Sequence, residues 1–450
     1  MARNPRDVAA AAIARGVGGL TRILKAGEGS SLPGVVVERL SPGFSGRRAA
    51  TLPGGVVVVS GTNGKTTTAS MLRTILRATG DPTVGNATGA NLRQGIASAL
   101  LRIPDRARTA VFEVDEAALP ALVTELRPRV LVLTNVFRDQ LDRYGEAERV
   151  VQLLAEAARR LPPGAVVVAN ADDATLFEAL AERTPEGFGI ALPADGAEVR
   201  HGIGVEAEVC PRCGARLAYE RRTISHLGTA RCDACGWASA DPGVLVHVVA
   251  RDGLRSVTLE VGEARFTLPT GGLHNAYNVA AALAAAARLG VPLERGVDAL
   301  RTFRARFGRI EELRIDGRGV WLTLMKNPAA ADVLIQELAA DASVGAIVVV
   351  LNDAAADGRD VSWIWDVDFE RLAGGVPMVP SGHRADDMAV RLKYAEATAR
   401  PSVDHPLAAI RAALAESPDR SVVVMATYTA MLEVRASVRG RGARLTDANV

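Results

Sequence analysis

No stretch of this sequence reaches the about 18 unbroken apolar residues that are needed to cross a lipid bilayer. Runs such as Val56–Val59 and Ala346–Leu351 have only the length of a β-strand. The beginning of the chain is a poor signal peptide, because the apolar stretch that follows Arg3 and Arg6 is short and is interrupted by Arg15. We therefore expect a cytoplasmic protein.

An excess of either charge is also lacking, since 53 basic and 51 acidic residues give a net charge of +2. Nothing in this balance points to nucleic acid as a partner. Residues 1–50 differ from the rest, because they contain only three acidic residues beside the basic ones Arg3, Arg6, Arg15, Arg22, Lys25, Arg39, Arg47 and Arg48. This segment fits a solvated helix face, or contact with an anionic membrane surface or a phosphate-bearing substrate.

Aromatic residues make up only 4% of the chain, whereas 48% of the residues are apolar and 23% are charged. This composition excludes a mostly disordered chain, and 450 residues suggest two or three domains of about 150 residues each. Short β-branched runs alternate with Ala-rich helical patterns, which predicts an α/β fold with a parallel sheet covered on both faces. The predicted strands are Val56–Ser60, Ala110–Asp115, Val130–Asn135, Val166–Asn170, Ala346–Asn352 and Val422–Ala426. The predicted helices are Thr67–Ala78, Glu146–Leu161, Asn275–Leu289 and Pro406–Ala415.

Two interruptions divide this pattern. Residues 201–241 hold all four cysteines of the chain and have the character of an inserted module. The pattern changes again before Val320, where a new strand–helix series starts. We therefore expect an N-terminal basic segment over 1–50, a central domain over 51–305 and a Rossmann-like α/β domain over 306–450.

A glycine-containing loop, Gly61–Thr68, joins the predicted strand Val56–Ser60 to a predicted helix. In such a loop the backbone N–H groups turn inward around an anion, and the helix N-terminus adds the positive end of its dipole. Lys65 would reach the terminal phosphates of a nucleotide, and the hydroxyl of Thr66 would join the shell of a Mg²⁺ ion. A plain glycine turn would explain neither the lysine nor the hydroxyl. The predicted binding residues of the loop are Gly61, Thr62, Asn63, Gly64, Lys65, Thr66 and Thr67.

The loop sequence G-T-N-G-K-T-T-T departs from the general phosphate-loop pattern, since Val59 stands where that pattern has its first glycine. It resembles the ATP loop of the Mur ligase superfamily, whose members join amino acids to cell-wall precursors, or glutamates to folate, through an acyl phosphate. A GTPase is a poor alternative, because no N-K-x-D guanine motif occurs in the chain. The resemblance implies a Mur-ligase-like central domain that binds ATP and Mg²⁺.

Further motifs of this superfamily follow in the same order. Glu113 stands where the family has a carboxylate for Mg²⁺. The alternative is that it simply lies in a solvated turn, as a lone acidic residue after a strand usually does. The stretch T-N-V-F-R-D-Q-L-D, which starts at Thr134 and contains Asn135, resembles the family's T-N-x-x-x-D-H-x-D, with Gln140 in place of histidine. Asn170–Asp173 resembles its N-x-D-D turn.

Two later motifs complete the implied nucleotide site. The stretch G-L-H-N-A-Y-N opens an Ala-rich helix and resembles the family's G-x-H-N-x-x-N motif, whose side chains approach the nucleotide. Phe307–Glu311 resembles an F-x-G-R-x-E element with one residue fewer, in which an arginine stabilises phosphate charge. Beyond the loop, the implied ATP-binding residues are Asn135, His274, Asn275, Asn278 and Arg309.

The four cysteines form the pattern C-x₂-C-x₁₈-C-x₂-C with Cys210, Cys213, Cys232 and Cys235. In a cytosolic chain with no other cysteine, this spacing favours Zn²⁺ on four thiolates over disulfides. Four protein ligands leave no open position, so the zinc would be structural. A ribbon that binds nucleic acid is the competing role, and its basic residues would be Arg212, Arg216, Arg221, Arg222 and Arg231.

The last domain departs from the pattern of amino-acid-adding Mur ligases. Those enzymes carry D-Y-A-H-N-P at its first strand, whereas this chain has L-M-K-N-P, with Lys326 in the place of the histidine. The stretch before Val56 is also too short for the uridine-nucleotide domain of such ligases. We therefore expect activation of a carboxylate by ATP, with a different acceptor.

The block Leu351–Asp366 contains D-G-R-D-V-S-W-I-W-D and, with the cysteines and the K-N-P stretch, resembles the MurT family. The resemblance implies amidation of the D-glutamate α-carboxylate of lipid II to D-isoglutamine, at the inner face of the cell membrane. It also implies a partner, the glutamine amidotransferase-like subunit GatD, which supplies ammonia. The residues agree, because glutamine hydrolysis usually needs a cysteine nucleophile and all four cysteines are assigned to zinc.

Family members are thought to lend an aspartate of this block to the partner's Cys–His pair, where it orients the histidine. We favour Asp360 and then Asp357, whereas the alternative for each is a carboxylate that caps a loop or helix. Trp363 and Trp365 fit an interface or core packing equally well. The predicted catalytic residues are Asp360, Asp357, Lys65 and Glu113, and the predicted Mg²⁺ ligands are Thr66 and Glu113.

Two other functions fit parts of the sequence. Direct addition of an amino acid, as by a Mur ligase or folylpolyglutamate synthase, fits the loop. The absence of the D-Y-A-H stretch counts against it. A nucleic-acid-binding regulator would combine the ribbon with a switch ATPase, and steeply salt-dependent retention on nucleic acid would support it.

Overall fold

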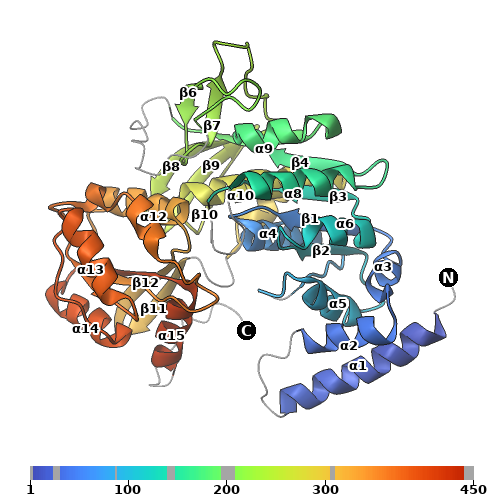
Figure 1. Cartoon of the computed structure of the whole chain (residues 1–450), viewed down its shortest axis with the longest axis horizontal. Helices are drawn as coiled ribbons and strands as arrows, with labels where there is room; N and C mark the ends of the chain where they lie inside the picture. Colours follow the sequence, from blue (N-terminus) through green and yellow to red (C-terminus); the bar gives the residue numbers. More distant parts are fainter. Residues whose placement is uncertain are drawn as a thin grey trace.

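The computed structural model describes residues 4–23, 31–86, 89–138, 147–193, 208–304 and 310–439. Its larger sheet has the strand order β10-β9-β8-β5-β4-β3-β1-β2 (Figure 1). The strands from β2 to β8 in this order are parallel, and β9 and β10 add an antiparallel edge. The strands are β1 (Gly55–Ser60), β2 (Thr109–Glu113), β3 (Val130–Leu133), β4 (Val166–Asn170), β5 (Glu186–Ala191), β8 (Val244–Asp252), β9 (Ser256–Val261) and β10 (Ala264–Leu268).

Helices cover both faces of this sheet, as the unbroken apolar strands predict. Val57 and Val59 of β1 pack against one helical layer, and Val56 and Val58 pack against the other. The first layer contains α4 (Lys65–Ala78), α10 (Leu273–Arg288) and α11 (Leu293–Leu300). The second contains α5 (Arg93–Leu101), α6 (Leu119–Leu126), α8 (Ala147–Arg159) and α9 (Ala174–Ala179), which is followed by the short 3₁₀ helix η1 (Ala181–Arg183).

The basic segment before β1 forms three helices on the second layer: α1 (Pro5–Ile23), α2 (Leu32–Leu40) and α3 (Phe44–Ala49). Ala14, Val37 and Phe44 belong to the same core cluster as α5 and α6. Helices α2 and α5 approach so closely that a Cβ on Gly34 would lie 1.8 Å from the Gln94 carbonyl oxygen. Glycine is therefore required at this crossing.

The smaller sheet has the order β11-β12-β15-β13-β14, with β11 antiparallel and the other strands parallel. This agrees with the predicted Rossmann-like α/β fold. The strands are β11 (Ile310–Ile315), β12 (Arg318–Leu324), β13 (Val344–Val350), β14 (Met378–Ser381) and β15 (Ser421–Ala426). One face carries α12 (Pro328–Ala340), α13 (Ala385–Tyr394) and the 3₁₀ helices η2 (Ser362–Asp366) and η3 (Phe369–Leu372). The other carries α14 (Pro406–Glu416) and α15 (Tyr428–Arg439).

The cysteine-containing module projects from the larger sheet beside α9 (Figure 1). It is built on a hairpin of β6 (Ala218–Arg222) and β7 (Gly228–Arg231). A small cluster around Trp237 forms its own core, and Trp237 Nε1 donates a hydrogen bond to Glu178 of α9 at 2.9 Å. Within the residues described, no helix combines the length and hydropathy of a membrane span.

Candidate active site

The phosphate loop lies between β1 and α4, and its two glycines are required by the geometry. Gly61 and Gly64 have φ angles of +117° and +90°, which favour glycine. A Cβ on Gly61 would lie 2.4 Å from Thr134 Oγ1, and one on Gly64 would lie 2.3 Å from Asn278 Oδ1. The backbone of the loop is therefore packed directly against two of the motifs that the sequence singled out.

Lys65 is buried at the first position of α4. Its ammonium group donates to the Gly61 carbonyl at 2.6 Å and forms an ion pair with Glu116 Oε1 at 2.8 Å. Glu116 is not among the predicted site residues, although it stands only three positions after Glu113. The signal for its role is its position just after the carboxyl end of β2, at the edge of the sheet where the loop lies.

The two predicted Mg²⁺ ligands lie in contact. The hydroxyl of Thr66 donates to Glu113 Oε2 at 2.7 Å. Asn86 fixes this end of β2, because it accepts from the Glu113 N–H and donates to the Glu113 carbonyl, both at 2.9 Å. Oxygen donors of this kind are the ligands that Mg²⁺ prefers, so the pair fits the predicted ion.

Asn135 shapes the phosphate loop through both its backbone and its side chain. Its carbonyl accepts from the Thr62 N–H at 2.8 Å, and its Oδ1 accepts from the Asn63 N–H at 2.9 Å. Its Nδ2 donates back to the Asn63 carbonyl at 3.1 Å. Through these hydrogen bonds Asn135 holds the loop in its conformation.

The start of α10 lies against the same loop. Asn278 accepts a hydrogen bond from Thr68 of α4 at 3.2 Å and donates to Asn275 at 3.1 Å. Asn275 donates to the Gly271 carbonyl at 2.7 Å, and His274 is half-buried in the first turn. Thr67, which precedes Thr68 on α4, is also buried. Arg309, like Asp139, Gln140 and Asp142, lies outside the described residues.

The smaller sheet contributes the K-N-P stretch to the loop. Lys326 Nζ donates to the Thr62 carbonyl at 2.9 Å, and Asn327 Nδ2 donates to Asn63 Oδ1 at 3.3 Å. Asn327 Oδ1 also caps α12 by accepting from the Ala330 N–H at 2.9 Å. Two segments that are about 260 residues apart in sequence thus form one site. The sequence alone does not predict this contact.

The two candidate aspartates of the acidic block have different surroundings. Asp357 is 6% exposed and accepts hydrogen bonds from the N–H and hydroxyl of Thr429 and from the Ala354 N–H. Asp360 is exposed, and hydrogen bonds from the backbone and hydroxyl of Ser362 hold its pKa below the usual range. Asp357 therefore braces the start of α15, whereas Asp360 is a charged carboxylate that another molecule can reach.

An exposed aromatic pair lies on the same side of the smaller sheet as η2. Trp365 is 45% exposed and Tyr394 is 68% exposed, and their rings meet edge to face at 5.6 Å. The guanidinium of Arg391 lies 5.5 Å from the Trp365 ring. Trp363 is half-buried and packs on the core of this sheet. Of the two tryptophans, only Trp365 offers substantial area for a partner.

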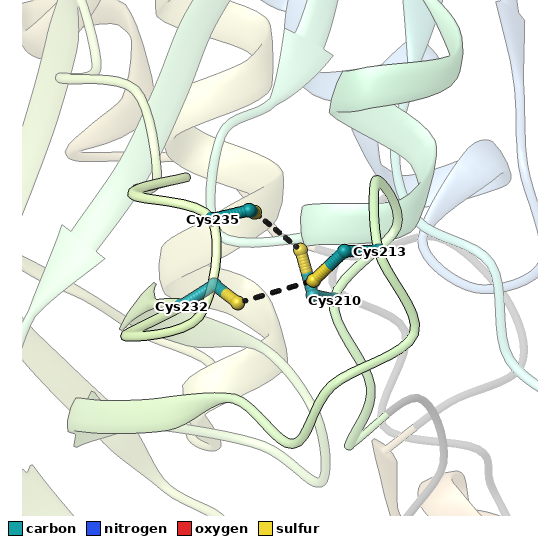
Figure 2. Close-up of side chains that lie close together, drawn as sticks. All are labelled: Cys210, Cys213, Cys232 and Cys235. Carbon is teal, nitrogen blue, oxygen red and sulfur yellow. Dashed lines mark hydrogen bonds between the residues drawn. The ribbon is translucent and has the colours of Figure 1, made fainter.

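The four cysteines converge at the end of the β6–β7 hairpin (Figure 2). Their sulfur atoms all lie within 4.8 Å of one another, and two pairs lie at 3.5 and 3.6 Å. Zn–S bonds of about 2.3 Å in a tetrahedron give S–S separations of this size. The donor set and its spacing therefore fit Zn²⁺, and all four cysteines are free of disulfides.

We expect replacement of Cys232 by serine to remove the bound metal and to lower the melting temperature by several degrees or more. The ribbon has only a small apolar cluster of its own, so metal binding would supply much of its folding free energy. Metal analysis and thermal unfolding of the variant test this, with Glu220→Ala on the exposed side of β6 as the control. A wild-type protein that purifies without zinc would contradict the assignment.

Comparisons with known proteins find matches to both the larger and the smaller sheet. Residues 59–201 match the Mur ligase middle domain, and residues 324–431 match the MurT ligase C-terminal domain. A pseudomurein peptide ligase type C from Methanothermus fervidus superimposes with a TM-score of 0.67 at 22% identity, covering 86% of this chain and 78% of that one. The fold is therefore that of the Mur ligases.

Curated relatives define the family more closely. The subunit MurT of lipid II isoglutaminyl synthase (glutamine-hydrolyzing) from Streptococcus pneumoniae is 33% identical over 92% of this chain and 93% of its own length. The protein of the same name from Staphylococcus aureus (strain COL) is 31% identical over 82% of this chain and 83% of its own length. The chain belongs to the MurT family.

Proposed function

We propose that this chain is the ATP-dependent subunit of a lipid II isoglutaminyl synthase. It converts the D-glutamate α-carboxylate of the stem peptide into the amide of D-isoglutamine. The observation that carries the proposal is that the chain has a loop suited to ATP but no cysteine left to hydrolyse glutamine. A nucleotide loop is assembled from both sheets, whereas every cysteine of the chain belongs to the metal cluster, so the chain has no thiol nucleophile for glutamine.

The reaction proceeds in two steps. A carboxylate oxygen of the substrate attacks the γ-phosphorus of ATP, which forms an acyl phosphate and releases ADP. Ammonia then attacks the acyl carbon, inorganic phosphate leaves with the former carboxylate oxygen, and a proton is released. Lys65 stabilises the charge that develops during phosphoryl transfer, and the binding residues of the loop hold the phosphates.

Thr66 and Glu113 would hold Mg²⁺, which offsets phosphate charge when it is bound. The other predicted contacts to ATP come from Asn135, from the start of α10 and from Arg309. Lys326 replaces a histidine of the amino-acid-adding enzymes, and we assign to it a second positive charge beside the loop. The cysteine cluster holds a structural Zn²⁺.

A GatD-type glutaminase supplies the ammonia and docks on the smaller sheet. We assign to Asp360 the orientation of the histidine in its Cys–His pair, because Asp360 is charged and exposed and stands two residues before η2, which carries Trp365. In the proposed division, residues 51–305 form most of the nucleotide site, and residues 306–450 complete it with Arg309 and Lys326 and bind the partner. The basic segment 1–50 faces the cytoplasmic surface of the membrane. The lipid substrate places the enzyme at that surface.

ATP hydrolysis by the isolated chain tests the choice of acceptor. With lipid II present, we expect ammonium salts to stimulate the release of phosphate and amino acids to have no effect. Stimulation by an amino acid, with formation of a peptide bond, would instead support an amino-acid-adding ligase.

A further inference from the structure

The turn of the β6–β7 hairpin in the cysteine-containing module, which we also call the ribbon, is not exposed to solvent. This turn, Thr223–Leu227, which we call the ribbon tip, is inserted into the core of the larger sheet. Ile224 is 5% exposed and Leu227 is 1% exposed, and both belong to the core cluster that contains α4 and α10. The ribbon is therefore anchored at the end opposite its cysteines.

The tip contacts the N-x-D-D turn that follows β4. His226 Nε2 lies 3.6 Å from Asp173 Oδ2, and the Gly228 N–H donates to the Asp172 carbonyl at 2.9 Å. The hydroxyl of Thr223 lies 2.5 Å from that of Tyr277 on α10, which donates to Asp172 Oδ2 at 2.7 Å. These polar groups are buried, so each of them depends on its partners.

From this turn the contacts continue to the phosphate loop. Asp173 Oδ2 accepts from the Val136 N–H at 2.9 Å, next to Asn135. The ring of His226 packs on that of Phe137, with centroids 4.9 Å apart. The Phe137 N–H then donates to Thr62 Oγ1 in the loop at 3.1 Å. The ribbon tip is thus linked through a single residue, Phe137, to Thr62 of the predicted ATP site.

The other end of the hairpin leads to the metal cluster. Strand β7 runs from Gly228 to Arg231 and is followed directly by Cys232. Tyr219 of β6 donates to the His226 carbonyl at 2.9 Å, which ties the tip back to the hairpin. A metal that fixes the cysteine end therefore also fixes the strands that carry His226.

We propose that the ribbon tip positions the nucleotide loop, with His226 as the positioning residue, and that metal occupancy and nucleotide affinity are thereby coupled. The coupling rests on the proposed zinc site, whereas the role of His226 does not. The module is then a part of the ATP site and more than a stabilising insertion.

Replacement of His226 by alanine tests the positioning role. We expect the affinity for a non-hydrolysable ATP analogue, measured by calorimetry, to fall about tenfold, which is within the range of ordinary site-to-site coupling. Metal content and kcat at saturating ATP should stay near those of the wild type, and Glu220→Ala should bind the analogue normally. An unchanged affinity in a folded His226→Ala protein would overturn the proposal.

The wild-type protein provides a second test that requires no variant. Coupling between two sites is reciprocal, so the ATP analogue must raise the affinity for zinc by the factor by which zinc raises the affinity for the analogue. Competition with a chelator, with and without the analogue, should show a several-fold increase. Equal zinc affinities would refute the coupling, whereas a protein without any zinc site would refute the metal assignment and leave the His226 test standing.

Discussion

Replacement of Lys65 by alanine is expected to reduce ATP-dependent amidation by about a thousandfold or more. A cation that is fixed against the transferred phosphoryl group acts most strongly in the transition state, where the charge develops. The ammonium of Lys65 is buried and is held by the Gly61 carbonyl and by Glu116, so its position is fixed before the nucleotide binds. The measurement is product formation from lipid II and ammonium with the isolated chain.

Loss of folding has to be separated from loss of chemistry in this variant. Removal of Lys65 leaves the carboxylate of Glu116, which is 6% exposed, without its ion-pair partner. The double variant Lys65→Ala/Glu116→Gln removes that buried charge and should fold while it stays inactive. Lys393→Ala, on an exposed position of α13, is the matched control and should keep its activity with ammonium. Near wild-type activity in a folded Lys65 variant would contradict the assignment of the loop.

Replacement of Asp360 by asparagine should remove glutamine-driven amidation but spare amidation with a high concentration of ammonium. Asparagine can hydrogen-bond a histidine, but it can select the wrong tautomer and cannot stabilise an imidazolium. The same exchange in the catalytic triad of serine proteases lowers kcat by about 10⁴-fold. Both rates are measured on the chain reconstituted with its glutaminase partner.

Asp357→Asn is the internal comparison for this experiment. Because Asp357 holds the start of α15 through Thr429, its neutralisation should lower the melting temperature, whereas Asp360→Asn should not. Equal loss of the glutamine and ammonium reactions in Asp360→Asn would move this residue to the synthetase site. Loss of neither would exclude it from both reactions.

The sequence predicted the parallel strands because their β-branched runs are buried on both sides and therefore unbroken. For some strands, however, the predicted C-terminal end lies beyond the observed one. The predicted strand Val130–Asn135 ends at Leu133, since Thr134 and Asn135 leave the sheet to pack against the phosphate loop. The antiparallel edge from β8 to β10 was not predicted, because its strands alternate between buried and partly exposed residues.

The motifs located the site, but the contacts within it depend on tertiary structure. Lys326 could be recognised only as a replacement for histidine, and its contact with Thr62 joins segments from different sheets. His226 has no motif of its own, because its role follows from where the hairpin turn is inserted. Glu116 and Asn86 act through the end of β2, which spacing alone does not show.

Nitrogen transfer tests the central claim most directly. The chain and its glutaminase partner are incubated with lipid II, ATP and glutamine labelled with heavy nitrogen at its side-chain amide, and the stem peptide is analysed by fragmentation in a mass spectrometer. The account predicts one heavy nitrogen in the amide on the α-carboxyl of D-glutamate and one ADP for each amide formed. A stem peptide extended by an amino acid, or an amide that forms without ATP, would contradict it.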